Sequence, residues 1–157
     1  MATHNHSKKL QFYSIFKHDY KISSYLDLTR NSTKRKDSVK IRTNNNKLMI
    51  ETGRYHQTPH NDRFCPVCNY GIIEDEFHFL LHCPKYSIPR EKLYNQIQHN
   101  FVDFNQLSCT ELIIKLMKSQ NFSVNSHLLK FISLCNELRI NNLLSNYTDD
   151  IFPKGKT

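Results

Sequence analysis

Residues 64–84 decide the fold, and they read Phe64-Cys-Pro-Val-Cys-Asn-Tyr-Gly-Ile-Ile-Glu-Asp-Glu-Phe-His-Phe-Leu-Leu-His-Cys-Pro84. Two residues separate Cys65 from Cys68, nine more precede His78, and a further four precede Cys83. A Cys-x2-Cys turn brings two thiolates onto one metal ion, and three thiolates with one imidazole form a closed tetrahedral set typical of structural zinc. The spacing therefore predicts a Zn²⁺ site at Cys65, Cys68, His78 and Cys83.

The residues between the ligands predict how the chain brings them together. Pro66 presets the turn between the first two cysteines, and Asn69 tolerates the left-handed conformation needed after it. The acidic run 74–76 favours a helix N-terminus. His78 and Cys83 stand about 140° apart on an ideal α-helix, so both reach one ion only if the helix unwinds at Cys83. The proline that follows favours such an ending.

Other readings of these residues are weaker but remain open at this point. His82 lies one turn from His78 and could replace Cys83 in a Cys2His2 set, although cysteine binds zinc as an anion. A redox pair at 65 and 68 lacks the strand–helix context of thioredoxin-like proteins. The remaining alternative is that these residues form no metal site and are three buried cysteines and an unrelated histidine. Cys109 and Cys135 are expected to be small core residues, and His4, His6, His56 and His60 to be solvated.

Helical patterns dominate the rest of the chain. They predict helices over 31–43, over 89–101, behind a capping box at 108–111, and over 126–145. The expected fold is a mainly α, small helical domain organised around one zinc knuckle, with room for a short β-hairpin. We divide it into a basic N-terminal part (1–63), the knuckle and short helix (64–86), C-terminal helices (87–145) and a frayed polar tail (146–157), all in one domain.

Composition and charge limit the classes of function. With 157 residues, 38% hydrophobic side chains and a mean hydropathy of −0.62, the core is modest and a metal would add useful stability. No apolar run is long enough for a membrane helix, and the N-terminus does not resemble a secretory signal, so we expect an intracellular protein. Residues 1–63 carry 13 lysines and arginines against 5 acidic residues. This excess of 8 positive charges equals the net charge of the whole chain, +8. Such asymmetry predicts a polyanionic partner.

Three stretches resemble a known family: residues 47–55, the Cys-Pro-x-Cys at 65–68, and residues 74–86. Together they are similar to the zinc-binding segment that follows the polymerase in non-LTR (LINE-type) retrotransposon reverse transcriptases. The similarity extends roughly over residues 10–139. It implies the same four metal ligands and a role in holding template RNA or target DNA. Asn46 departs from the histidine often found there.

The resemblance does not extend to catalysis. The sequence has no polymerase motif in a suitable context, because Tyr147-Thr148-Asp149-Asp150 lies in a polar tail without apolar strand neighbours. We therefore expect no enzymatic activity and no catalytic residues. The expected function is a non-catalytic zinc-binding domain that binds RNA or single-stranded DNA, with Tyr55 or Phe64 stacking on a base. The candidate phosphate contacts are Lys34, Arg35, Lys36, Lys40, Arg42, Lys47 and Arg54.

Two alternatives to nucleic-acid binding stay open. The chain could be a zinc-stabilised protein-interaction module that docks a partner on the short helix at His78 and on the helix spanning Leu128–Leu138. It could also be a fragment of a mobile element with no function of its own.

Overall fold

The computed structural model describes residues 10–18, 26 and 32–151, with side chains up to 144. This part of the chain is helical and contains no strand, which confirms the mainly α prediction. The α-helices are α1 (Gln11–Phe16), α2 (Ser32–Arg42), α3 (Met49–Tyr55), α4 (Ser87–Ile97), α5 (Cys109–Lys118) and α6 (Phe122–Ile151). Single turns of other helix types are η2 (His60–Asp62), η3 (His78–His82), η4 (Pro84–Tyr86), η5 (Gln98–Asn100) and η6 (Phe104–Gln106).

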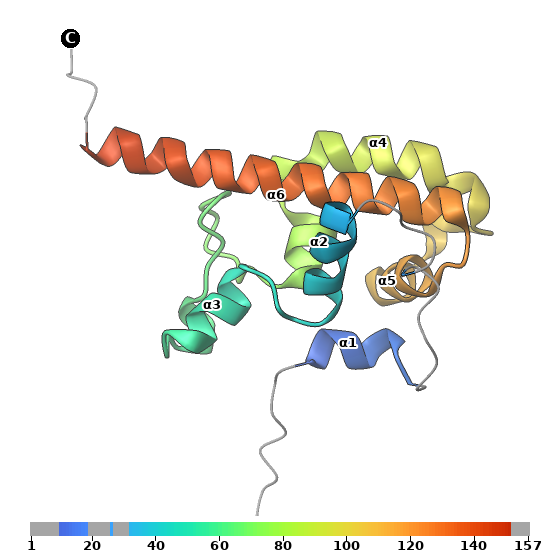
Figure 1. Ribbon diagram of the computed structural model, residues 1–157, viewed down its shortest axis with the longest axis horizontal. Helices are drawn as coiled ribbons and strands as arrows, with labels where there is room; N and C mark the ends of the chain where they lie inside the picture. Colours follow the sequence, from blue (N-terminus) through green and yellow to red (C-terminus); the bar gives the residue numbers. More distant parts are fainter. Residues whose placement is uncertain (1–9, 19–25, 27–31, 152–157) are drawn as a thin grey trace, which may run out of the picture.

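The long helix α6 organises the other elements. Helices α4 and α2 pack along it, α5 lies near its N-terminal end, and α1 packs against α5 (Figure 1). The last turns of α6 extend beyond the rest of the molecule. One apolar core joins these helices to the cysteine segment, and its most deeply buried side chains include Phe79, Ile97, Ile113, Val124 and Ile132.

Helix α6 is longer at both ends than the predicted helix over 126–145. Its N-terminus is set by Asn121, whose Oδ1 accepts hydrogen bonds from the backbone N–H groups of Ser123 (2.8 Å) and Val124 (3.3 Å). An asparagine N-cap of this kind starts a helix one residue later. At the other end no glycine or proline interrupts the chain before Pro153. The prediction of a frayed tail from residue 146 is therefore wrong as far as Ile151.

The helix starts that rest on capping chemistry agree with prediction. Ser108 Oγ accepts a hydrogen bond from the Glu111 backbone at 3.3 Å, and Glu111 Oε2 accepts one from the Ser108 backbone at 2.9 Å. This reciprocal pair is the predicted capping box of α5. Helix α4 starts at Ser87, so Pro89 lies in its first turn rather than at its first residue.

Arg42 is buried, so its prediction as a phosphate contact is wrong. The side chain is 1% exposed. Its Nη1 donates to the Met117 carbonyl at 2.6 Å and its Nε donates to Ser38 Oγ at 3.2 Å. The guanidinium also lies 5.9 Å from the centre of the Phe16 ring, within the range of a cation–π contact. Arg42 thus fixes the end of α2 to the end of α5.

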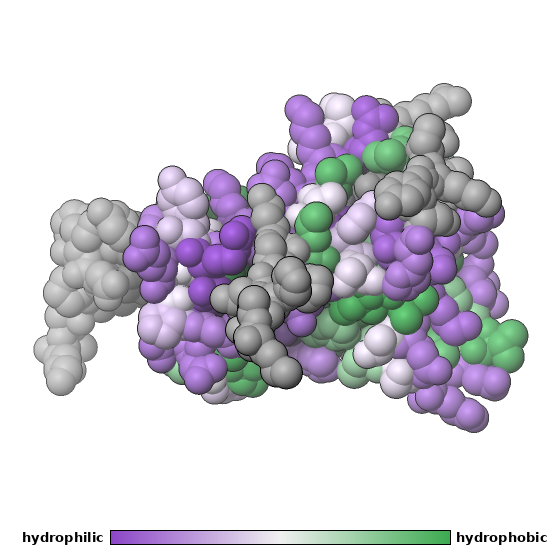
Figure 2. Space-filling model, turned by 90° about the horizontal axis from the view of Figure 1, so that it is seen from below, coloured by the Kyte–Doolittle hydropathy of each residue, from purple (hydrophilic) through white to green (hydrophobic). Residues whose placement is uncertain are grey.

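Most of the apolar side chains that the interaction-module alternative needed are also internal, with Leu134 of α6 (42% exposed) as an exception. Leu128, Leu129, Phe131 and Ile132 are all buried on the inner face of α6. Phe79, Leu80 and Leu81 of the short helix are buried as well. On the face of the molecule shown in Figure 2, hydrophilic side chains surround and interrupt the apolar patches.

Within the described residues, no helix is both long enough and apolar enough to cross a bilayer.

Candidate metal centre

The structure brings the four predicted ligands together. One ligand atom from each of Cys65, Cys68, His78 and Cys83 lies within 4.8 Å of all the others, and all four residues are buried. Cys68 Sγ lies 3.5 Å from His78 Nε2. Such a cluster could hold a metal ion.

A tight reversal of the chain positions the first two cysteines. The backbone N–H of Cys65 donates to the Ile72 carbonyl at 2.8 Å, and that of Glu74 donates to the Arg63 carbonyl at 2.9 Å. Between these two bonds, Phe64 and Ile73 form one isolated antiparallel bridge, so the predicted hairpin is reduced to a single rung. Asn69 and Gly71 have φ values of 57° and 65°, the left-handed conformation that reverses the chain.

A π-helical turn solves the problem of the five-residue spacing. The Cys83 backbone N–H donates to the His78 carbonyl at 2.7 Å, which is an i→i+5 bond instead of the α-helical i→i+4 bond. This wider turn places Cys83 above His78, and Cys83 itself leaves the helix with φ −58° and ψ 120°. Asp75 holds the start of the turn, because its Oδ1 accepts the His78 N–H at 2.7 Å. Single π turns of this kind are frequent at functional sites.

His82 faces away from the cluster. It is exposed, and its Nε2 lies 3.3 Å from Cys109 Sγ, on α5. The structure therefore favours Cys83 over His82 as the fourth ligand. Cys109 is exposed, so its prediction as a core residue is wrong, whereas Cys135 is fully buried as predicted.

Hydrogen bonds and burial shift the pKa values of the three thiols in different directions. The hydrogen bond with Cys83 is the largest cause, and burial the second, that raise the pKa of Cys65 to about 12. The same bond lowers the pKa of Cys83, and burial raises the pKa of Cys68. A metal ion held by these thiolates would have to displace protons from Cys65 and Cys68. His78 Nδ1 has no hydrogen-bond partner among the described residues, so the cluster is that ring's main polar contact.

Glu74 connects the cluster to two helices. Its Oε1 lies 3.7 Å from Cys65 Sγ, and its Oε2 accepts the Met49 N–H at the start of α3 at 2.8 Å. Both oxygens also accept from Arg139 of α6, at 2.8 Å and 2.9 Å. Glu74 is only 1% exposed. Sequence reasoning missed this pair, although Arg139 repeats the buried positions Ile132 and Cys135 of α6 at helical spacing.

A second buried carboxylate, Glu76, has different partners. Its Oε1 accepts hydrogen bonds from Asn44 Nδ2 at 2.9 Å and from Asn46 Nδ2 at 2.8 Å. Burial raises the pKa of Glu76 to about 7. Asn46, the position where the resemblance predicted histidine, thus helps hold the turn between α2 and α3.

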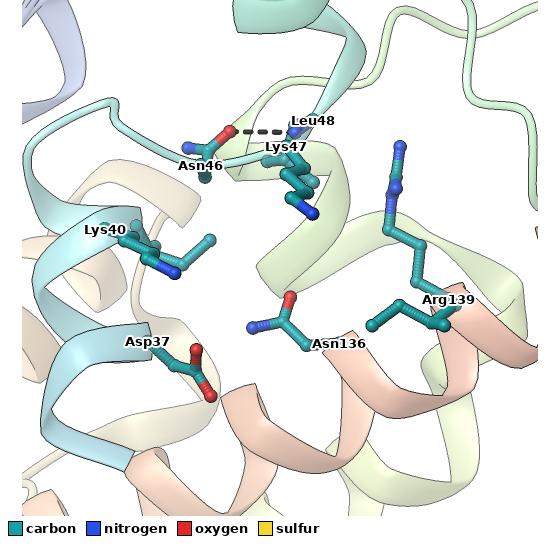
Figure 3. Close-up of a pocket in the computed structure, with 9 residues that line it drawn as sticks. Asp37, Lys40, Asn46, Lys47, Leu48, Asn136 and Arg139 are labelled. Carbon is teal, nitrogen blue, oxygen red and sulfur yellow. Dashed lines mark hydrogen bonds between the residues drawn. The ribbon is translucent and has the colours of Figure 1, made fainter. Parts of the chain in front are cut away.

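The predicted nucleic-acid residues are only partly brought together. Lys40 of α2 and Lys47 of the following turn are exposed and line one pocket of about 160 Å³, completed by α6 (Figure 3). Lys36 is exposed and Lys34 and Arg35 are half-buried, all on α2. Arg54, on α3, forms a 2.7 Å ion pair with Glu51. The aromatic candidates Tyr55 and Phe64 are 84% and 44% exposed.

The chain matches no protein-family profile, no curated protein and no solved structure.

Replacing the fourth ligand should remove the metal, whereas replacing its neighbour should not. We expect Cys83→Ser to retain less than roughly a tenth of a metal equivalent after dialysis, because three ligands hold a structural ion far more weakly than four. His82→Ala should keep about one equivalent, since His82 lies outside the cluster. Mass spectrometry of total metal in both variants checks this. Retention by Cys83→Ser with loss by His82→Ala would assign the site to Cys2His2.

The two buried glutamates should respond differently to neutralisation. Glu74→Gln leaves the buried Arg139 charge without its carboxylate and should lower the free energy of unfolding by about 3–5 kcal/mol. Glu76→Gln keeps the oxygen that both asparagines use, and burial already disfavours its charge, so the loss should stay below about 1 kcal/mol. Urea denaturation with saturating metal measures both. Equal losses would show that the Arg139 pair does not depend on charge.

Proposed function

We propose that this protein is a non-catalytic zinc-binding domain that binds RNA or single-stranded DNA through α2 and the turn after it. The observation that carries the proposal is the convergence of Lys40 and Lys47, from two different elements, on one pocket. Lysines that gather beside a cavity make a focused positive potential, which a solvated helix face does not need.

The charge distribution supports a polyanionic partner. The net charge of +8 is contained in residues 1–63, and Lys36, Lys40 and Lys47 in that segment are exposed. Lys34, Arg35 and Arg54 complete the proposed set of phosphate contacts, from which Arg42 is removed by its burial. Phosphate contacts of this kind supply most sequence-independent affinity for nucleic acids.

Exposed aromatic rings favour a single strand over a duplex. Tyr55 is 84% exposed at the end of α3, and Phe64 is 44% exposed at the bridge beside the cluster. Unpaired bases stack on such rings, and the gain is about 1–3 kcal/mol per base. Paired bases in a duplex do not present their faces in this way.

Zinc is the metal that best suits the cluster. Three thiolates and one imidazole are soft and borderline ligands, which select zinc over magnesium or calcium. Four protein ligands also leave no open coordination position, so the ion would stabilise the fold and not activate water. This argument supports the absence of catalysis in the proposed function.

The resemblance to the post-polymerase segment of non-LTR reverse transcriptases agrees with this proposal. It implies the same four ligands and a place beside template RNA or target DNA. The alternative of a protein-interaction module has less apolar surface to offer a partner, because Leu128, Leu129, Leu80 and Leu81 are buried, while Leu134 of α6 stays 42% exposed.

The bound metal should be zinc in stoichiometric amount. Protein purified under reducing conditions, without chelators, should contain about one zinc per chain. X-ray absorption should give Zn–S distances of about 2.3 Å. Chelation should melt the segment 64–86, since structural zinc contributes on the order of 10 kcal/mol to small domains. Iron or copper in place of zinc, or less than roughly a tenth of an equivalent, would contradict the assignment.

Binding to a single strand should depend steeply on salt and on three lysines. Changing Lys36, Lys40 and Lys47 to glutamine together should reduce the log–log salt slope by about two, at roughly 0.7 per phosphate on a single strand. A matched variant removes three exposed lysines elsewhere, Lys85, Lys92 and Lys118. Its slope should change far less, and both variants should keep their zinc. Fluorescence anisotropy with a labelled oligonucleotide gives the slopes. Binding absent at low salt, or equally affected by both triples, would overturn the proposal.

A further inference from the structure

The pocket at Lys40 and Lys47 has a mixed lining that a phosphate site alone does not require. Its cationic and amide groups are Lys40, Lys47, Asn46 and Asn136, and Arg139 lies at its edge. In Figure 3 the ends of Lys40, Lys47 and Asn136 turn toward one another. Asp37 adds a carboxylate one turn before Lys40 on α2. The apolar lining comes from Ile41, Leu48 and Ile140.

Several of these polar side chains make no hydrogen bond or ion pair with another described residue. Arg139 is committed to Glu74, and Asn46 is committed to Glu76 and to the Leu48 backbone. By contrast, the side chains of Asp37, Lys40, Lys47 and Asn136 take part in none of the hydrogen bonds or ion pairs between described residues. Asp37 and Asn136 are nevertheless half-buried. Side-chain donors and an acceptor therefore line the pocket without a partner among the described residues.

The size of the pocket suits one small aromatic ring. Its volume is about 160 Å³. A cavity of about 150 Å³ accepts a benzene molecule. A six-membered pyrimidine ring matches this volume, and the two fused rings of a purine exceed it.

We propose that this pocket takes one pyrimidine nucleotide of the bound strand and prefers cytosine, an inference that rests on the proposed function. The carboxylate of Asp37 accepts a hydrogen bond from the exocyclic amino group of cytosine, the pairing that acidic side chains make with this base. Asn136 donates to a ring nitrogen or carbonyl, and Lys40 and Lys47 contact the flanking phosphate.

Thymine and uracil are disfavoured by the same carboxylate. They carry a carbonyl oxygen where cytosine carries its amino group, so an acceptor would meet an acceptor. Discrimination by repulsion is a common source of specificity. The basic helix then supplies affinity for any strand, and the pocket supplies preference for one base.

Two labelled strands of equal length test the preference. The zinc-loaded full chain is titrated at pH 7.5 with fluorescein-labelled dC12 and dT12, and anisotropy gives both dissociation constants. We expect dC12 to bind about tenfold more tightly, the scale of one good base contact. In Asp37→Asn the amide can both accept and donate, so the preference should fall below about twofold while binding is kept.

A control and a second variant separate charge from contact. Glu91→Gln removes one exposed acidic charge on α4, away from the pocket. It should strengthen binding of both strands slightly and leave their ratio unchanged. Ile140→Trp fills the pocket from the exposed side of α6 and should abolish the preference without touching a charge. Circular dichroism and zinc content verify that each variant is folded.

The outcomes distinguish the pocket from the general function. Equal binding of dC12 and dT12, with the lysine triple still weakening both, would overturn the pocket proposal and leave the proposed function standing. A preference for dC12 that survives both Asp37→Asn and Ile140→Trp would also overturn it. Failure of both strands to bind at low salt would overturn both proposals.

Discussion

The carboxylate of Glu74 is the constraint on which the rest of the structure depends. A charge this deeply buried is tolerated only if its oxygens are fully hydrogen-bonded. Glu74 meets this condition with the guanidinium of Arg139 and the first amide of α3, and its Oε1 also lies 3.7 Å from Cys65 Sγ. The cysteine cluster, α3 and α6 are thereby positioned by a single side chain. The cluster is consequently part of the helical core and not an independent knuckle on its surface.

The ligand set was predictable because all the information it needs is local. Two cysteines separated by two residues, and a histidine and cysteine before a proline, restrict the chain to a few geometries. Asn69 and Gly71 adopt the left-handed conformations that their residue types allow. The sequence predicted that a regular α-helix cannot bring His78 and Cys83 to one ion, and it favoured unwinding at Cys83. The π turn itself was not predictable, because the choice between unwinding and widening a turn depends on the packing around it. In this chain, Asp75 caps the turn and buried Phe79 and Leu80 hold it.

The features that sequence reasoning missed are those whose partners lie far along the chain. Arg42 and Arg139 resemble solvated charges in a one-dimensional pattern, yet their acceptors are 75 and 65 residues away. A residue's burial follows from its partners, and spacing along one helix does not reveal them. Cys109 shows the converse error, since a small apolar residue in a helix lies exposed beside His82. Helix α6 was underestimated because the cap at Asn121 was overlooked and its polar end was judged by composition.

The cluster residues are close together in the sequence, whereas Glu74 and Arg139 are far apart, and this difference affects the order of folding. The four cluster residues lie within 65–83, so closing the loops between them costs little chain entropy and their assembly is local. Arg139 must come from 65 residues away, and contacts of that kind form slowly. A chain emerging from the ribosome would therefore assemble its cysteine cluster while Glu74 still lacks its cation. The packing of the cluster against the other helices then waits for α6, which carries Arg139.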